Sequence, residues 1–278
     1  MGGRRLVGGI TSSMHRLAVE TRGGSRTQVI LRRWTPTAWG EWTDARELVQ
    51  REAHVLQALA STDVPAPRLL AADANGNETG VSCLLMTRLP GRMDLAPADP
   101  QVWLRQMVDM AVRIHELEVD APPYEWEPKM VPVPAWTTRP GDWRAAGEVV
   151  RGAAPDHEDR FAHSDYQHFN LLWQRGRMTG VVDWVGAFRG PADVDVAHCR
   201  LNLAVLYSAE LAGDFLAAYE AEAGRRIDPY WDIRTATSPA RQDWASFIPI
   251  QVGGRTPFDA DAMRRRLDAH LAAALRRT

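Results

Sequence analysis

Most of the β-rich segments of this 278-residue chain lie before Pro100, whereas helical segments dominate after it. Short runs rich in β-branched residues, bounded by glycine, proline and asparagine, predict strands in the first part. Apolar residues that recur three and four positions apart predict helices in the second part. Runs of strands followed by runs of helices are typical of α+β proteins built as two layers or lobes. The order of the segments therefore predicts a two-part α+β fold.

The first part is expected to contain four strands and one helix. Two β-rich runs on either side of Gly23-Gly24-Ser25 predict a hairpin. Apolar residues at helical spacing predict a helix from Asp44 to Ala60. Two more strands are expected over Arg68–Asp73 and Val81–Met86, and residues 87–91 are expected to cross into the second part.

The second part is expected to be mainly helical. Its predicted helices span Gln101–Leu117, Asp193–Leu211, Asp214–Ala223 and Asp259–Arg277. The proline-rich residues 122–140, which follow the first of these helices, are expected to form an ordered surface excursion.

Composition limits the partners that such a chain can have. Its net charge of −2 gives no basic excess, so a nucleic-acid partner is not expected. No 18 apolar residues run together and MGGRRLVGGI lacks the apolar run of a signal sequence, so we expect a soluble, cytoplasmic protein without a membrane partner. Neither Cys83 nor Cys199 has a second ligand at metal-binding spacing, so both are expected to be small buried residues. Because Lys129 is the only lysine, any cation needed in the N-terminal part must be arginine.

The strongest chemical signal is a set of polar residues around two short β-rich segments. His163, Asp165 and Asn170 form the pattern H-x-D-x-x-x-x-N, and Asp183 follows at the end of an apolar strand. A carboxylate on the loop before the strands, such as Asp165, can accept a hydroxyl proton while a metal ion bridges phosphates. Phosphoryl transfer needs little beyond such positioning and charge stabilisation. The alternative interpretation is that Asp165 and Asn170 only cap a tight turn.

The two short segments predict a preformed metal site. Leu171–Trp173 and Gly180–Val182 are expected to form a hairpin around the polar turn Arg175–Arg177. Such a hairpin places Asn170 opposite Asp183, and cross-strand Cβ atoms lie about 4.5–5.5 Å apart on one face of a sheet. An amide oxygen and a carboxylate held in this way can share one Mg²⁺, which usually takes one or two carboxylates plus substrate phosphates and water.

The order of His163, Asp165, Asn170 and Asp183 resembles the catalytic and metal-binding loops of aminoglycoside phosphotransferases, choline kinases and their relatives. The following GPADVDVAHCRLNLAVLY is similar to the stretch after that family's metal-binding aspartate, with Asp195 at the place of its structural aspartate. The resemblance covers nearly the full chain and is specific from His163 to Asp195. It implies an α+β, two-lobed protein-kinase-like fold.

In that fold, residues 1–88 are expected to form the nucleotide-binding lobe, an antiparallel sheet with one helix. Residues 89–278 are expected to form the catalytic and acceptor-binding lobe, which is mainly helical with a catalytic β-hairpin. The resemblance further implies transfer of the γ-phosphate of ATP, with GTP not excluded, to a hydroxyl group of a small molecule. The acceptor is expected to be an antibiotic or a metabolite, the cofactor Mg²⁺, and the protein a monomer or weak homodimer, with antibiotic resistance as one role.

The same resemblance assigns roles to the motif residues. Asp165 is expected to be the catalytic base, His163 to brace its loop, and Asn170 and Asp183 to be magnesium ligands. Ser164 replaces the glycine that is usual in the family, a change that removes no reacting group.

A cationic residue in the first part is needed to bind phosphate. Glu52 lies on the apolar stripe of its predicted helix, where an unpaired carboxylate is costly. Alternation places Arg32 on the same strand face as Ile30, and similarity of Leu31-Arg32 to the family's Leu-Lys pair nominates Arg32 as the phosphate clamp paired with Glu52. Arginine binds phosphate and carboxylate bidentately, so it can replace lysine here. A purely structural Arg32–Glu52 pair is the alternative.

Two further segments resemble nucleotide-binding elements of the family. The stretch with Gly9, Ser12 and Ser13 is similar to its nucleotide-binding loop, where small residues let backbone N–H groups approach phosphates. By itself such a stretch is more often a plain turn. Met86 and Arg88 correspond, by resemblance only, to the segment that contacts adenine.

The acceptor is not identified by the sequence. Five acidic residues cluster after the first predicted C-terminal helix and either line a site for a cationic acceptor or form a solvated helix end: Glu116, Glu118, Asp120, Glu125 and Glu127. A catalytically silent nucleotide-binding pseudokinase is the alternative function. A protein kinase is disfavoured because Asp183-Trp184-Val185 replaces Asp-Phe-Gly and no Ala-Pro-Glu segment follows.

Overall fold

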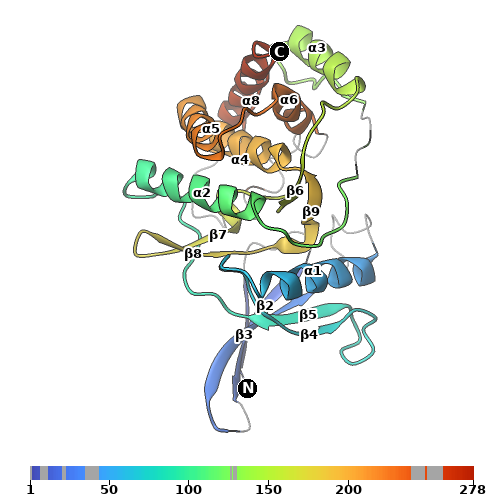
Figure 1. The fold of residues 1–278 in the computed structure, drawn as a ribbon, viewed down its shortest axis with the longest axis vertical. Coiled ribbons are helices and arrows are strands. Elements are labelled where there is room, and N and C mark those ends of the chain that lie inside the picture. The colour runs from blue at the N-terminus through green and yellow to red at the C-terminus, as the bar shows by residue number, and fades with distance from the viewer. Residues whose placement is uncertain are drawn as a thin grey trace.

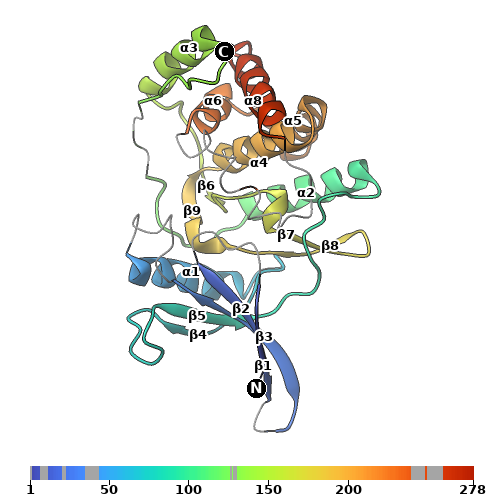
Figure 2. The same ribbon diagram turned by 180° about the vertical axis from the view of Figure 1, so that it is seen from behind.

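The computed structural model of the protein has two parts arranged along its longest axis (Figure 1). A five-stranded sheet with α1 (Ala45–Leu59) lies at one end and most helices lie at the other, and the view from behind shows the same separation (Figure 2). A hairpin of β7 (Leu171–Gln174) and β8 (Arg177–Val181) lies between them. The structure describes residues 2–6, 12–20, 23–34, 44–125, 127, 130–238, 248 and 259–278.

The sheet is antiparallel, with its strands in the order β1-β2-β3-β5-β4. Its members are β1 (Gly2–Arg5), β2 (Ser13–Glu20), β3 (Arg26–Arg33), β4 (Leu69–Asp73) and β5 (Cys83–Thr87). The predicted hairpin is confirmed as the β2–β3 pair, and Gly24 in its turn has a φ of 80°, a conformation that glycine adopts without steric cost. The first strand was not predicted, because glycine and arginine have little β-propensity.

The helix predicted near Asp44 is confirmed as α1. The Asp44 side chain caps it by accepting a hydrogen bond from the backbone N–H of Arg46. Four of its apolar residues are buried, among them Val49, Val55 and Leu56, each 1% exposed or less. Burying such a side chain contributes about 1.5–3 kcal/mol, so this stripe holds α1 against the rest of the protein and brings Glu52 into the interior.

The hairpin predicted from the motif region is confirmed. Its loop consists of Arg175 and Gly176, with φ values of 54° and 73°, as a two-residue type I′ turn requires. A second two-stranded sheet pairs β6 (Asp159–Ala162) with β9 (Phe188–Pro191), which was not predicted. Together these strands hold the loop that contains His163 and Asp165 between the hairpin and the helices.

Within the described residues, six helices build most of the second part: α2 (Pro100–His115), α3 (Pro140–Arg151), α4 (Asp193–Leu206), α5 (Ala209–Ala223), α6 (Pro229–Ala236) and α8 (Ala260–Leu275). The prediction of one helix from Asp193 to Leu211 is wrong at its end. Ser208 caps α5 by accepting from the N–H of Leu211, so the chain breaks there and α5 begins before the predicted Asp214. The short helices α3 and α6, each opened by a proline, were not predicted.

A central helix organises the second part. Twelve of the fourteen residues of α4 are buried, since it packs against α5, α6 and α8. One hydrophobic core runs from the sheet through α1 and α2 to α4 and α5. A second core joins α3, α6 and α8 to the other side of α4. The chain thus has the predicted α+β, two-lobed protein-kinase-like fold, with the antiparallel sheet in the first lobe and helices in the second.

The two cysteines and the proline-rich residues 122–140 were also the subject of predictions. Cys83 and Cys199 are buried free thiols, as expected. The described part of residues 122–140 is mostly exposed and is anchored where the N–H of Tyr124 donates to the carbonyl of Arg189. None of the described helices is both long and apolar enough to cross a membrane.

Candidate active site

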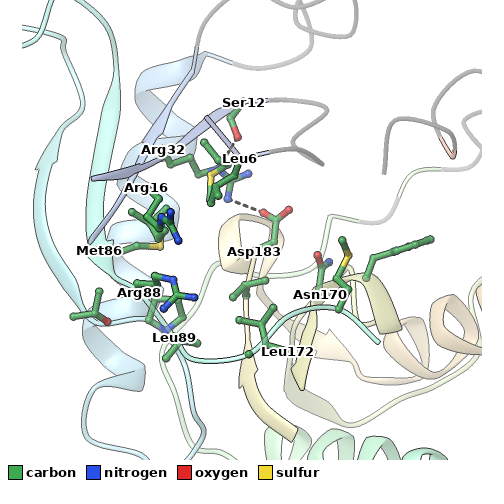
Figure 3. Close-up of a pocket in the computed structure, with 18 of the residues that line it drawn as sticks. Leu6, Ser12, Arg16, Arg32, Met86, Arg88, Leu89, Asn170, Leu172 and Asp183 are labelled. Atoms are coloured by element: carbon green, nitrogen blue, oxygen red, sulfur yellow. Dashed lines mark hydrogen bonds and ion pairs between the residues drawn. The ribbon is translucent and has the colours of Figure 1, made fainter. Parts of the chain in front are cut away.

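A cavity of about 410 Å³ lies between the sheet and the β7–β8 hairpin (Figure 3). Eight of the predicted site residues line it: Ser12, Arg32, Glu52, Met86, Arg88, Asp165, Asn170 and Asp183. Ser13 and His163 are not part of its lining, and Gly9 lies outside the described residues. The fold therefore brings residues from strand, helix, crossover and hairpin to one site.

The loop before the hairpin is held by His163, which is fully buried. Its Nε2 lies 2.9 Å from the carbonyl oxygen of Val182, and its Nδ1 lies 3.3 Å from the backbone nitrogen of Asp165. A carbonyl only accepts and an N–H only donates, so the imidazole is neutral with its proton on Nε2. The backbone N–H of His163 donates to Asp195 Oδ2 over 2.6 Å. These contacts tie the loop to the end of β8 and to α4.

Ser164, the residue between His163 and Asp165, has a φ of 77°. This left-handed conformation is unusual for serine and is one that glycine adopts freely. A Cβ atom on Gly186 would lie 3.0 Å from the Cβ of Ser164, so the two positions are packed against each other. The serine that replaces the family's glycine is thus accommodated at the cost of backbone strain.

We expect Ser164→Gly to raise the free energy of unfolding by about 0.5–1 kcal/mol, because it removes this strain. Urea unfolding of the two proteins measures the difference. Ser164→Ala is the matched control, since it removes the hydroxyl and keeps the Cβ atom. Equal stabilisation by both changes would show that backbone strain is not the cause.

The side chain of Asn170 is oriented by Asp165. Its Nδ2 lies 2.8 Å from the backbone oxygen of Asp165 and 2.8 Å from Asp165 Oδ2. Because both partners only accept hydrogen bonds, the NH₂ group must face them. The amide oxygen of Asn170 is therefore directed away from Asp165 and is available as a ligand.

Asp183 reaches the cavity in a different way from the one expected. The hairpin pairs Leu171 with Val181, and the N–H of Val182 donates to the carbonyl of Asn170, so Asn170 lies opposite Val182. The predicted pairing of Asn170 with Asp183 is wrong by one residue, a shift that points a strand side chain to the opposite face. Asp183 has left the strand, with φ 70° and ψ 60°, and this left-handed turn directs its carboxylate into the cavity.

Arg32 links the sheet to the hairpin (Figure 3). Its Nη1 lies 2.9 and 3.0 Å from the two carboxylate oxygens of Glu52 and 2.6 Å from Asp183 Oδ1, and its Nε donates to Ser12 Oγ over 2.9 Å. Arg32 and Glu52 are 3% and 1% exposed. Burial alone would lower the pKa of Arg32, but Asp183 and Glu52 together raise it above its usual value. Burial raises the pKa of Glu52, and the charge of Arg32 opposes that rise.

The cavity also contains a cation that was not predicted. Arg16 on β2 lines it and points into it beside Met86 and Arg88. The signal was present in the sequence, since alternation along this extended segment places Ser12, Met14 and Arg16 on one face. The five acidic residues after α2, in contrast, do not line the cavity, and all five are exposed, which agrees with a solvated helix end.

The donors at this site suit a metal ion that is shared with a substrate. Among the described residues, no group of three or more His, Cys, Asp and Glu side chains could hold a metal ion by itself. The site instead offers the amide oxygen of Asn170 and the carboxylate of Asp183. Mg²⁺ is commonly bound by one or two protein oxygens plus phosphates and water, so these residues fit it.

The fold and this cavity together are those of a two-lobed, kinase-like protein. Residues 7–230 match the phosphotransferase enzyme family, and the chain belongs to that family. None of the curated proteins matches the sequence.

Solved structures of aminoglycoside and related kinases have the same fold. A thermostable mutant of aminoglycoside phosphotransferase APH(4)-Ia, in its apo form, is 17% identical with a TM-score of 0.64, covering 98% of this chain and 94% of its own. A further variant of that mutant, in a ternary complex with ADP and hygromycin B, is 15% identical with a TM-score of 0.62, over 98% and 94% of the two chains. The amicoumacin kinase hAmiN, in complex with AMP-PNP, Ca²⁺ and Ami, is 13% identical with a TM-score of 0.54, over 95% and 88%.

Proposed function

We propose that this protein is a small-molecule kinase that transfers the γ-phosphate of ATP to a hydroxyl group of an antibiotic or metabolite. The observation that carries the proposal is the meeting of Asp165, Asn170, Asp183 and Arg32 in one cavity. A proton acceptor, two oxygen ligands and a cation are the groups that phosphoryl transfer requires. Solved structures of the same fold that contain ADP or AMP-PNP with an antibiotic support the choice of substrates.

In this proposal each lobe binds one of the two substrates. Residues 1–88 bind the nucleotide, with its base near Met86 and Arg88 and its phosphates near Arg32. Residues 89–278 bind the acceptor and carry the base. The hydroxyl of Ser12 accepts from Arg32 and so directs its own proton elsewhere, where it can donate to a phosphate oxygen.

In the proposed reaction, Asp165 accepts the proton of the acceptor hydroxyl as the acceptor oxygen bonds to the γ-phosphorus. The bond from the γ-phosphorus to the bridging oxygen breaks, and ADP leaves. Asn170 and Asp183 would hold Mg²⁺, which supplies positive charge to the phosphates when bound. The guanidinium of Arg32 supplies further positive charge. To do so, it must release Asp183 and bind a phosphate oxygen instead. Glu52 keeps that guanidinium in place during the exchange.

The proposal is tested by incubating the protein with MgATP and a panel of acceptors, with ADP release and phosphorylated product as readouts. The panel contains aminoglycosides, macrolides, peptide antibiotics, choline-like amines and sugars. Product with at least one acceptor, dependent on Mg²⁺, supports the proposal. Binding of ATP without turnover on any acceptor would instead favour the nucleotide-binding pseudokinase, and phosphorylation of peptides would favour a protein kinase.

We expect Asp165→Asn to lower kcat by about 10²- to 10³-fold, because the amide cannot accept the acceptor's proton. The KM for ATP should change little, since Asp165 is not placed on the phosphates. Steady-state kinetics at saturating acceptor measure both constants. Asp142→Asn on the outside of α3 is the matched control and should behave as wild type. If the Asp165→Asn protein keeps wild-type activity, Asp165 is not the base.

A further inference from the structure

A histidine that the proposed reaction does not use contacts the proposed base. His198 on α4 is 6% exposed, and its Nε2 lies 2.7 Å from Asp165 Oδ1. At this distance the imidazole nitrogen and the carboxylate oxygen are in direct polar contact. The contact joins the central helix directly to the carboxylate that lines the cavity.

Helix α4 holds the loop at two neighbouring points. Asp195 and His198 are three residues apart, so they project from the same face of the helix. Asp195 accepts from the N–H of His163, and His198 contacts the Asp165 carboxylate, so the residues on both sides of Ser164 are fixed. A loop held on either side of a left-handed residue cannot relax that strain by moving. The position of the base is therefore set by α4 as well as by the hairpin.

The two oxygens of the Asp165 carboxylate have different surroundings. Oδ1 is contacted by His198 and accepts a hydrogen bond over 2.6 Å from Gln167 Nε2, so it faces α4 and the loop. Oδ2 accepts over 2.8 Å from Nδ2 of Asn170, a residue that itself lines the cavity. The Asp165 side chain is 41% exposed, and of these three partners only Asn170 lines the cavity, whereas Gln167 and His198 do not. Oδ2 is therefore the oxygen placed to meet an acceptor hydroxyl.

We propose that His198 is a positioning residue that orients Asp165 so that Oδ2 faces the acceptor. The proposal rests on the proposed function, in which Asp165 is the base. Gln167 alone cannot set this orientation, because it lies two residues after Asp165 in the same loop and moves with that loop. His198 comes from a helix with twelve buried residues, which makes it the rigid support for the carboxylate.

Three variants separate this role from simple packing. His198→Leu removes the donor at similar volume, and His198→Gln keeps an N–H donor at similar reach. His270→Leu removes another buried histidine, which lies on α8 and does not line the cavity. Should His198→Leu fail to fold, His198→Asn replaces it, because its shorter amide does not reach the carboxylate.

We expect His198→Leu to lower kcat by about 10- to 100-fold, since misplacing a reacting group by about 1 Å costs up to 10²-fold. The KM for ATP should stay within about twofold of wild type, because the loss affects the reacting geometry and not nucleotide binding. His198→Gln should recover kcat to within about threefold of wild type, because a neutral donor is enough to orient the carboxylate. His270→Leu should keep wild-type kcat.

Crystal structures of the His198→Leu and His198→Gln proteins provide a readout that does not depend on turnover. We expect the Asp165 carboxylate to rotate away from its wild-type position in the first and to keep it in the second. An unmoved Asp165 in the His198→Leu structure, or equal loss of kcat in both variants, overturns the proposal. If the wild type phosphorylates no acceptor, the proposed function fails, and the two structures still decide whether His198 positions Asp165.

Discussion

Replacing Asp183 with alanine is expected to abolish phosphoryl transfer, with kcat lowered by about 10⁴-fold. The carboxylate is one of the two proposed ligands for Mg²⁺, and metal stabilisation of the transferring phosphate is worth several kcal/mol, where each 1.4 kcal/mol is about tenfold in rate. The ion pair with Arg32 is lost as well, but the Asp183 side chain is 37% exposed, so this loss alone costs at most about 1 kcal/mol of stability.

The left-handed backbone of Asp183 requires a matched control. Alanine tolerates a φ of 70° less well than aspartate or asparagine, so the alanine variant also acquires strain. Asp183→Asn keeps the shape and the backbone preference and removes only the charge. We expect it to lose most of the activity while unfolding at the wild-type temperature. Titration with Mg²⁺ at fixed ATP is the measurement, and turnover within about tenfold of wild type in the asparagine variant would exclude Asp183 as an essential ligand.

Replacing Arg32 with methionine is expected to lower the free energy of unfolding by about 3–5 kcal/mol. Glu52 is 1% exposed, and removing one partner of a buried ion pair leaves an uncompensated charge in the interior. The pKa of Glu52, which burial already raises, should rise further without Arg32. When the carboxyl pKa is higher in the folded than in the unfolded state, stability falls as the pH rises from the unfolded-state value to the folded-state value, so the variant should lose less stability at pH 5 than at pH 8.

The double variant Arg32→Met with Glu52→Met separates folding from phosphate binding. Replacing both members of a buried ion pair by apolar side chains is often neutral for stability, so the double variant should regain most of what the single variant loses. It should remain inactive, because no cation reaches the phosphates from β3. Urea unfolding and ATP binding measure the two effects. If the stable double variant binds and turns over ATP normally, the Arg32–Glu52 pair is purely structural.

Arg32→Lys is the conservative control at this position. Lysine keeps the charge but contacts Glu52 through a single compact group in place of a planar guanidinium. In the present structure the guanidinium spans Glu52, Asp183 and Ser12 at once. We expect the lysine variant to fold and to retain measurable activity.

Local patterns were sufficient for elements whose shape depends on neighbouring residues. The β7–β8 hairpin was predictable because Arg175-Gly176 is a turn sequence between two apolar runs, and α1 because its apolar spacing and its Asp44 cap agree. The break between α4 and α5 was not predictable from spacing, since apolar residues continue through it. A single serine cap and the packing of both helices decide where the chain turns.

The class of fold, the motif loop and the identity of the groups in it could be predicted from the sequence, because strand and helix periodicity and the motif spacing are local properties of the chain. Which of these groups touch depends on how distant parts of the chain pack together. Arg32 and Asp183 are 151 residues apart, and the His198–Asp165 contact depends on how α4 packs against the loop. One residue of register at the hairpin and the left-handed backbone of Asp183 set the direction of its carboxylate. Such contacts depend on the packing of separate elements, which no spacing along the chain specifies.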